Sequence, residues 1–189
     1  MAMDNLAYQE DWRTETINGS VVFMSPRPAI AHNRTAENIS RAFGNYLEGK
    51  PCEAFSRGTD VHLTEKDCVV PDAMIVCRSD IIRDNAIYGA PDLIVEVLSP
   101  GSEKRDRGYK KDLYERCGVR EYWIADPRSL SVEVYLLADG KYVLDEVYRI
   151  FPDYTEFYPN EKERYPDAVP VSLYEDFSIP LIKIFYRVV

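Results

Sequence analysis

Hydrophobic positions along the chain fall into short runs typical of strands and wider spacings typical of helices. Apolar, β-branched runs bounded by turn residues cover 69–76, 92–98 and 121–125, which predicts three buried strands. Alternating apolar and polar positions predict hairpins over 14–24 and 130–148. Their turns, Asn18-Gly19 and Asp139-Gly140, consist of residues that accept the positive φ of a tight hairpin.

Two segments have helical spacing instead. Ile39, Phe43 and Leu47 recur on one face and predict a helix over 31–47. After Ser99-Pro100-Gly101, a second helix is expected from Ser102, as its N-cap, to Cys117, and Gly118 ends it.

The other segments have weaker patterns. We expect strands at 52–56 and 60–64, a polar loop at 78–91, an excursion or arm at 150–170, a last strand over 179–189, and a short packed helix within 1–13. Strands and helices in this order predict an α/β (α+β) protein, with a mixed central β-sheet flanked by helices, an extra β-hairpin and a C-terminal extension.

Length and composition indicate an ordinary globular protein. The 189 residues, with 46% hydrophobic and 29% charged positions, favour one domain over 1–189. The sequence contains no apolar run long enough to span a membrane and no secretory signal pattern at its start. We therefore expect a soluble, cytoplasmic protein with no membrane partner.

Charge and cysteine content narrow the possible functions. The net charge of −9 argues against a broad DNA-coating surface, although a nuclease with a local basic patch stays possible. Cys52, Cys68, Cys77 and Cys117 form no CxxC pair and match no histidine spacing. Reduced structural thiols are therefore expected, and a zinc site is not.

Two acids and a lysine carry the candidate chemistry. Glu96 lies inside a buried strand, where a charge needs a partner. Antiparallel pairing of 69–76 with 92–98 would bring Asp72 close to Glu96. Lys110 falls on the inward stripe of its helix, which it shares with Asp106, Leu113, Tyr114 and Cys117.

The third acid of these strands, Asp92, lies roughly 13 Å from Glu96 at the rise of a strand. It is therefore expected to cap the strand entrance instead of sharing a metal.

These residue types suit metal-dependent phosphodiester hydrolysis. Two carboxylates, Asp72 and Glu96, suit Mg²⁺, for which Mn²⁺ can substitute, and Lys110 could orient water or stabilise a negative transition state. A structural interpretation fits equally well on sequence geometry, because a buried Glu96–Lys110 salt bridge and an Asp72 turn cap would account for the same residues.

Four ordered motifs carry a family resemblance, and they are Val70-Pro71-Asp72, Ala90 to Pro100, Asp106 with Lys110 and Tyr114, and Gly118 to Pro127. The chain resembles the restriction-endonuclease-like family within the PD-(D/E)XK nuclease superfamily, over about 14–137. The resemblance implies a restriction-endonuclease-like core, with Asp72 and Glu96 as metal ligands and Lys110 as the catalytic lysine. The segment of about 150–189 lies outside that core.

The chain departs from the family pattern at two places. Leu98 stands where the superfamily lysine is expected. The resemblance implies that the following helix supplies the lysine, which is Lys110 here. Ser20 replaces an acid that usually follows the hairpin glycine, and Asn18 stands where Asp is common. If that acid assists catalysis, the chain would be weakened or inactive.

Other candidate site residues are accessory: His32, Asp92 and Tyr114. His32 matches a recurrent family histidine at the site rim, although a position at the start of a helix explains it without a ligand role.

The sequence thus supports a Mg²⁺-dependent endonuclease that hydrolyses DNA, acting as a homodimer because duplex cleavage needs two active sites. The alternative is a catalytically weak or inactive nuclease-fold module for binding or assembly, which the acidic charge, Ser20 and the tyrosine-rich segment 150–170 favour. A phosphodiesterase acting on RNA or a nucleotide is a weaker possibility, because no aromatic stacking motif selects it.

Overall fold

A six-stranded mixed sheet forms the centre of the protein in the computed structural model, which describes residues 13–24, 28–152, 155 and 165–188. Its strands, in spatial order, are β11 (Lys141–Arg149), β10 (Ser131–Ala138), β9 (Glu121–Asp126), β8 (Leu93–Val97), β6 (Ala73–Val76) and β3 (Glu53–Ser56). Only β8 and β9 run parallel within this sheet. The predicted antiparallel pairing of the Asp72 and Glu96 strands is confirmed, with Ala73 opposite Val95.

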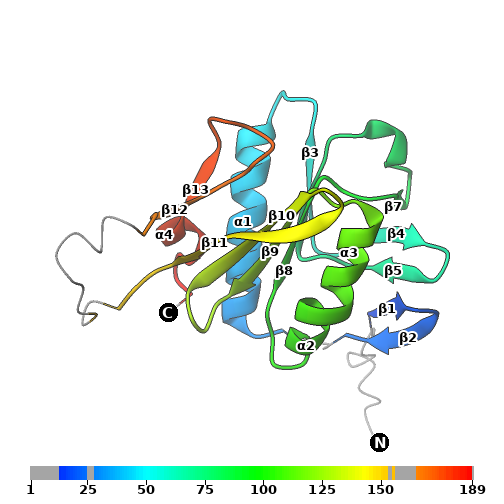
Figure 1. Cartoon of the computed structure of the whole chain (residues 1–189), viewed down its shortest axis with the longest axis horizontal. Coiled ribbons are helices and arrows are strands. Elements are labelled where there is room, and N and C mark those ends of the chain that lie inside the picture. The colour runs from blue at the N-terminus through cyan, green and yellow to red at the C-terminus, as the bar shows by residue number, and fades with distance from the viewer. Residues whose placement is uncertain (1–12, 25–27, 153–154, 156–164, 189) are drawn as a thin grey trace, which may run out of the picture.

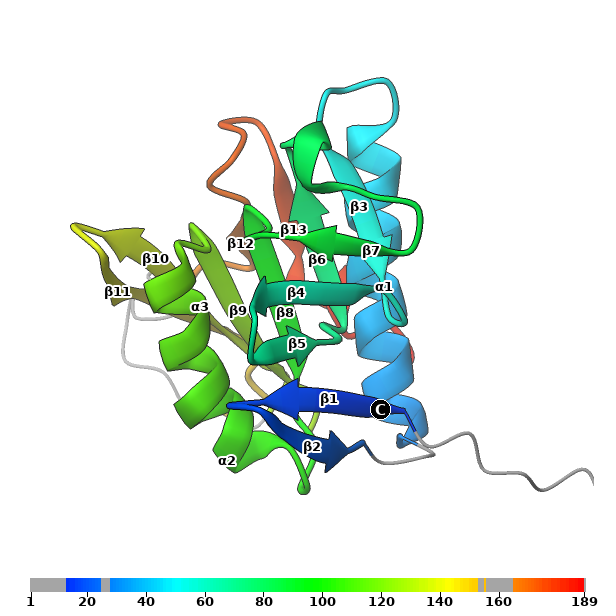
Figure 2. The ribbon, with the colours of Figure 1, turned by 90° about the vertical axis from the view of Figure 1, so that its right-hand side faces the viewer.

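A second, five-stranded sheet lies in front of the central one in Figure 2. Its strands, in spatial order, are β2 (Ser20–Phe23), β1 (Thr14–Ile17), β5 (Asp67–Val69), β4 (Asp60–Thr64) and β7 (Ala86–Tyr88). The predicted first hairpin is the β1–β2 edge of this sheet, and Asn18 and Gly19 have φ values of 49° and 75°.

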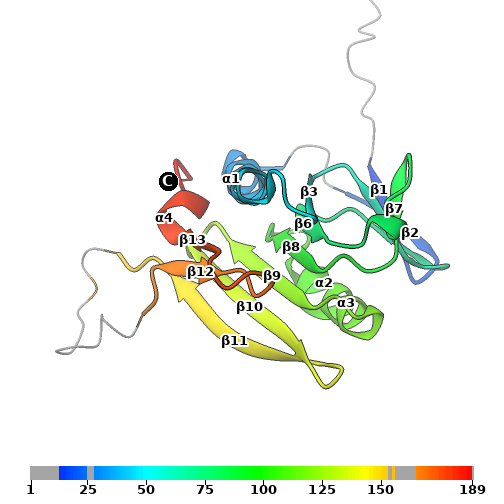
Figure 3. The same ribbon diagram turned by 90° about the horizontal axis from the view of Figure 1, so that it is seen from above.

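Helices cover both faces of the central sheet (Figures 1 and 3). On one face lies α1 (Ile30–Leu47), with the C-terminal β12 (Ala168–Pro170), β13 (Ser178–Pro180) and α4 (Leu181–Ile184). On the other lies a continuous helical segment made of α2 (Glu103–Arg105), the π-helical η3 (Asp106–Lys110) and α3 (Lys111–Cys117). Among the described residues, no helix has the length and apolar content needed to cross a membrane.

The alternation of side chains along β8 separates two hydrophobic cores. Val95 and Val97 pack with α1, whereas Ile94 packs with α3 and the five-stranded sheet. Because side chains alternate in a strand, Glu96 shares the face of Ile94. It is therefore directed to the side where η3 and α3 lie.

Three predicted elements differ in the structure. The run 69–76 is two strands, because the chain leaves the five-stranded sheet at Val69 and enters the central sheet at Ala73. The expected loop 78–91 contains a 3-10 turn, η2 (Ser79–Ile81), and β7, which pairs with β4. The last strand expected over 179–189 is a short strand, β13, followed by the helix α4.

Two local predictions need correction. Ser102 occupies the predicted N-cap position, but its side chain makes no capping hydrogen bond, and its hydroxyl oxygen accepts hydrogen bonds from Ser99 instead. Cys52 and Cys77 are not reduced thiols but form a disulfide between the start of β3 and the end of β6. Adjacent strands bring them together, since Glu53 pairs with Val76. The helix expected within 1–13 and most of the arm at 150–170 lie outside the described residues.

Candidate active site

A cavity of about 350 Å³ opens where β1, α1, β8 and η3 meet. Its walls carry charged side chains of both signs, which include Glu15, His32, Arg57, Asp72, Glu96, Arg105, Asp106 and Lys110. The predicted catalytic set of Asp72, Glu96 and Lys110 thus lies in one cavity. Each comes from a different part of the chain, so the tertiary fold creates the site.

Lys110 lies at the centre of this cluster. Its Nζ is 2.6 Å from Glu15 Oε1, 3.0 Å from Glu96 Oε1 and 3.8 Å from Asp106 Oδ1. The lysine is only 3% exposed. Burial lowers the pKa of Lys110. The negative charges of the three acids raise it by more, so the pKa lies above its ordinary value. Lys110 is therefore a fixed ammonium group, unsuited to act as a general base.

Glu96 is held from two positions on the same helical segment. Its Oε1 accepts hydrogen bonds from Lys110 and from the hydroxyl group of Tyr114, at 3.0 and 2.6 Å. Burial raises the pKa of Glu96 well above its usual range, Lys110 lowers it, and Asp106, Asp72 and Glu15 raise it further. The crowding of acids means that added positive charge would favour the ionised form of Glu96.

Asp72 lies at the crossing between the two sheets. Its Oδ2 accepts a 2.9 Å hydrogen bond from the Val97 amide and lies 3.3 Å from His32 Nε2. Its Oδ1 lies 3.1 Å from Nε of Arg57. Asp72 is therefore more than a turn cap, and His32 is a buried member of the site as well as a residue at the start of α1.

Glu15 is the acid that sequence reasoning missed. It is the one buried residue of β1, and its Oε1 accepts a hydrogen bond of 3.0 Å from the Val70 amide. An acid on the inner face of the alternating first hairpin was the available signal. Ser20, by contrast, is exposed on β2 and does not line the cavity. The acid of the hairpin thus comes from β1, so Ser20 does not leave the site without one.

Asp106 has the least satisfied carboxylate of the site. It is 1% exposed, and both of its oxygens accept no hydrogen bond. Burial raises its pKa, which Lys110 partly opposes. Glu15 Oε2 likewise accepts no hydrogen bond. The cavity therefore holds carboxylate oxygens that lack a donor.

The donor set fits Mg²⁺ in its chemistry. This cation takes oxygen ligands, and one or two carboxylates with waters are sufficient for it. The oxygens of Asp106 and Glu15 that accept no hydrogen bond are of that type. Their nearby cations are Lys110, 3.8 Å from Asp106 Oδ1, and Arg105, 3.8 Å from Glu15 Oε2. Within the described part of the chain, however, no three side chains of this cavity bring their ligand atoms to the spacing of one ion, and Lys110 lies among its acids.

Of the other predicted site residues, Tyr114 belongs to the site and Asp92 does not. Tyr114 contacts Glu96. Asp92 lies away from the cavity, where its Oδ2 accepts a 2.7 Å hydrogen bond from the Cys77 amide and its Oδ1 is 3.6 Å from Arg120. It is therefore structural, as its distance from Glu96 along the strand indicates.

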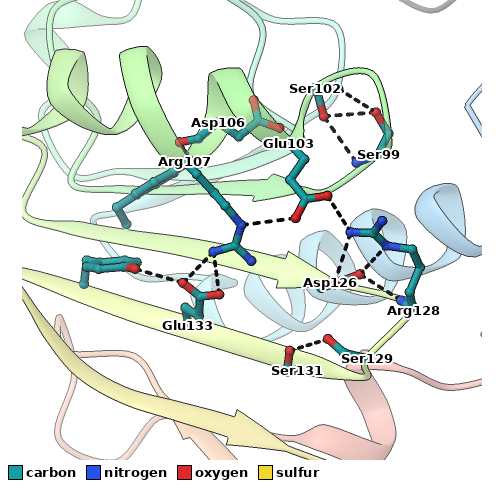
Figure 4. A network of polar contacts seen from close by, with 12 residues as sticks. Ser99, Ser102, Glu103, Asp106, Arg107, Asp126, Arg128, Ser129, Ser131 and Glu133 are labelled. Carbon is teal, nitrogen blue, oxygen red and sulfur yellow. Dashed lines mark hydrogen bonds and ion pairs between the residues drawn. The ribbon is translucent and has the colours of Figure 1, made fainter.

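A network of ion pairs fixes the helical segment that carries Asp106 and Lys110 (Figure 4). Arg107 lies between Glu103 and Glu133, at 3.4 and 2.7 Å. Arg128 joins Glu103 to Asp126, at 2.8 and 3.1 Å. The start of the segment is thereby tied to β9 and β10. A π-helical turn such as η3 is often found at functional sites.

Residues 104–111 are rich in Lys and Arg. Some of these basic side chains are held by neighbouring residues, and others line the cavity. Arg107 is engaged in the network, and the ammonium group of Lys111 lies 3.8 Å from the centre of the Tyr135 ring. Arg105 and Lys110 line the cavity. These two members of the basic run are therefore placed to meet a ligand inside the cavity.

Comparison with known proteins identifies the family and the fold of the chain. Residues 2–157 match the model of the Uma2 family, described as "Putative restriction endonuclease". The "Uncharacterized protein slr1290" of Synechocystis sp. (strain ATCC 27184 / PCC 6803 / Kazusa) is 27% identical over 106 residues, which are 55% of this chain and 56% of that relative. The match thus spans little more than half the length of the relative.

A similar solved structure comes from Anabaena variabilis ATCC 29413 and is described as "a putative nuclease belonging to DUF820". It superposes with a TM-score of 0.70 at 20% sequence identity, over 93% of this chain and 91% of that chain. At this identity the likeness establishes a shared fold, which is the mixed α+β architecture predicted from the sequence.

Proposed function

Since the chain belongs to the Uma2 family of restriction-endonuclease-like proteins, we propose that it is a Mg²⁺-dependent endonuclease that hydrolyses DNA phosphodiester bonds in this cavity. The observation that carries the proposal is Lys110, a buried ammonium group held between Glu15 and Glu96 at the edge of the cavity. A buried ammonium group among carboxylates from separate elements does not contribute to the charge of the protein surface. It suits a site where negative charge develops on a phosphate.

Each residue has a distinct proposed role. Asp72 and Glu96 hold Mg²⁺, with Asp106 and Glu15 as additional oxygen donors. When bound, the cation would lower the pKa of a water molecule and neutralise charge on the phosphate. Lys110 would orient the attacking water or stabilise the transition state, and Tyr114 positions Glu96. Arg57 and Arg105, at the cavity wall, contact neighbouring phosphates.

Cleavage of several DNAs, assayed with Mg²⁺ and with Mn²⁺, tests this function. Glu96→Gln keeps the shape of the side chain but removes its charge, so we expect cleavage to fall by about 10²–10³ or more. Glu53→Gln, an exposed acid on β3, is the matched control and should retain activity. Cleavage by the Glu96→Gln protein at the wild-type rate would exclude this site.

We also propose that the active form is a homodimer, because cutting both strands of a duplex requires two such cavities. Sedimentation at micromolar concentration should show a dimer. A monomer under conditions in which both strands are cut would contradict this part of the proposal alone.

A second candidate is a nuclease-fold binding module with little or no turnover. The observation that favours it is the closed cluster in which Lys110 lies among the acids that would hold the cation. Calorimetric titration with Mn²⁺ separates the two functions. Binding that Glu96→Gln abolishes supports the nuclease, whereas no Mn²⁺ binding together with intact DNA binding supports the module.

A further inference from the structure

Three side chains with metal-ligating atoms meet on the five-stranded sheet, outside the proposed active site. Asp60 and His62 lie on β4, and Cys68 lies on β5. One ligand atom from each lies within 4.8 Å of the other two. In the part of the chain that the structure describes, this is the one group of three or more His, Cys, Asp and Glu residues with that spacing.

Strand geometry explains why the three side chains converge. His62 pairs with Cys68 across the β4–β5 ladder, and Asp60 is two positions before His62 and so lies on the same face. The intervening Val61 and its partner Val69 are fully buried on the opposite, inner face. The group therefore occupies the outer face of the five-stranded sheet, whose strands are in front in Figure 2.

The closest pair already has the spacing of zinc ligands. Cys68 Sγ and His62 Nε2 are 3.8 Å apart. Tetrahedral zinc, with bonds of about 2.3 Å to sulfur and about 2.1 Å to nitrogen, separates such ligands by about 3.6 Å. A small adjustment of the exposed Asp60 side chain would complete a set of three ligands.

Neighbouring groups fix the histidine ring. The ring of His62 stacks on that of Tyr88 in β7, with centroids 4.6 Å apart and planes 12° apart. The guanidinium group of Arg83 covers the Tyr88 ring at 4.4 Å. The imidazole is therefore held with Nε2 directed to Cys68, which reduces the entropy lost when a metal binds.

We propose that Asp60, His62 and Cys68 bind Zn²⁺, with water at the fourth position. Thiolate with imidazole selects zinc over Mg²⁺ and Ca²⁺, and the charges of Asp60 and a Cys68 thiolate balance those of the ion. The site is separate from the proposed catalytic cavity, whose donors are mainly oxygen. It departs from the expectation, drawn from cysteine spacing alone, that a zinc site is absent.

The proposed ion would cross-link the strands that support the active site. β5 leads directly into Asp72, and Thr16 on β1, next to Glu15, pairs with Cys68. Bound zinc would therefore stabilise β4, β5 and β1 together, and its absence would loosen the frame that holds Glu15 and Asp72.

Cobalt provides the test, because it binds at zinc sites and gives a thiolate-to-metal absorption band. The wild-type protein, under argon and without reductant, should bind one Co²⁺ per chain with that band, and Zn²⁺ should displace it. Omitting the reductant keeps Cys52 and Cys77 in their disulfide, so Cys68 and Cys117 are the free cysteines of the described chain.

Matched variants decide the assignment. Cys68→Ser should lose the band, and His62→Ala should weaken Co²⁺ binding by about tenfold or more, whereas Cys117→Ser should keep both. Zinc should raise the unfolding temperature of the wild type and of Cys117→Ser but not of Cys68→Ser. Circular dichroism checks that each variant folds. A band that persists in Cys68→Ser, or no thiolate-to-metal band in the folded wild type with Co²⁺, would overturn the proposal.

Discussion

At the scale of single residues, Asp106 is the most informative group of the site. It is a buried acid whose oxygens lack hydrogen bonds, and its nearest cation is the Lys110 ammonium group at 3.8 Å. Burying a charge without hydrogen bonds costs free energy, so such a residue persists where function requires it. The sequence placed Asp106 on the inward stripe of its helix, but nothing in the sequence showed that its oxygens accept no hydrogen bond.

Asp106→Asn tests whether this cost is functional. Removing the buried charge should leave the free energy of unfolding unchanged or raise it by about 1 kcal/mol in the presence of a chelator. Cleavage with Mg²⁺ should fall by about tenfold or more, because an oxygen donor loses its charge.

Denaturant unfolding and the cleavage assay measure the two effects on the same samples. A variant that is destabilised by several kcal/mol would show instead that Asp106 is a structural partner of Lys110.

At the scale of elements, the sequence predicted the helices, hairpins and turns that are set by a local pattern of residues. The hairpins and α1 have clear periodicity, and the turns Asn18-Gly19 and Asp139-Gly140 have the expected positive φ values. The split of 69–76 between two sheets was not predicted, because its apolar character continues across Pro71. The helix near the end of the chain was not predicted either, because an apolar run as short as Ile179 to Ile184 fits a strand or a helix equally well.

Glu15 and the disulfide escaped prediction for a different reason. Both depend on which strands become neighbours, and β1 and β5, or β3 and β6, are set by the whole fold. Lys110 and Glu96 were predictable because one strand leads through one turn into one helix.

The Cys52–Cys77 disulfide gives a prediction for β3 and β6. It closes a segment with a sequence separation of 25 residues, so replacing both cysteines by serine should lower the free energy of unfolding by up to about 3 kcal/mol. Activity should persist, because Cys77 lies at the far end of β6 from Asp72.

Urea unfolding without reductant measures the loss, with Cys117→Ser as the single-cysteine control. An unchanged midpoint, with the wild-type disulfide verified by mass spectrometry, would contradict the prediction.

At the scale of the whole molecule, Glu121 attaches the C-terminal segment to the central sheet. Its Oε1 accepts a hydrogen bond of 2.6 Å from the Trp123 indole, and its Oε2 accepts one of 2.9 Å from the Ser172 amide and another from the Ser172 hydroxyl group. Burial raises its pKa, although these hydrogen bonds lower it in part. One side chain thus connects β9 with a segment distant in the sequence.

The raised pKa predicts a pH dependence of stability. The folded protein holds the Glu121 proton to higher pH than the unfolded chain does. The contribution of this group to stability is therefore full below its ordinary pKa of 4.5 and falls as the pH rises through the raised value. Glu121→Gln cannot titrate and should lack that fall.

The free energies of unfolding of both proteins are measured from pH 4 to pH 8. The stability of the wild type relative to Glu121→Gln should fall as the pH rises. A difference that is constant over this range would mean that Glu121 titrates normally.

The order of the site residues along the chain has a consequence for biosynthesis. Glu15 and Asp72 leave the ribosome before Glu96, and Lys110 follows last. Until the helical segment emerges, the acids of β1 and β8 lack the ammonium group that they share in the folded protein. The site is therefore completed only after the helical segment emerges, and a nascent chain stalled before this helix would carry these acids without the cation that they share.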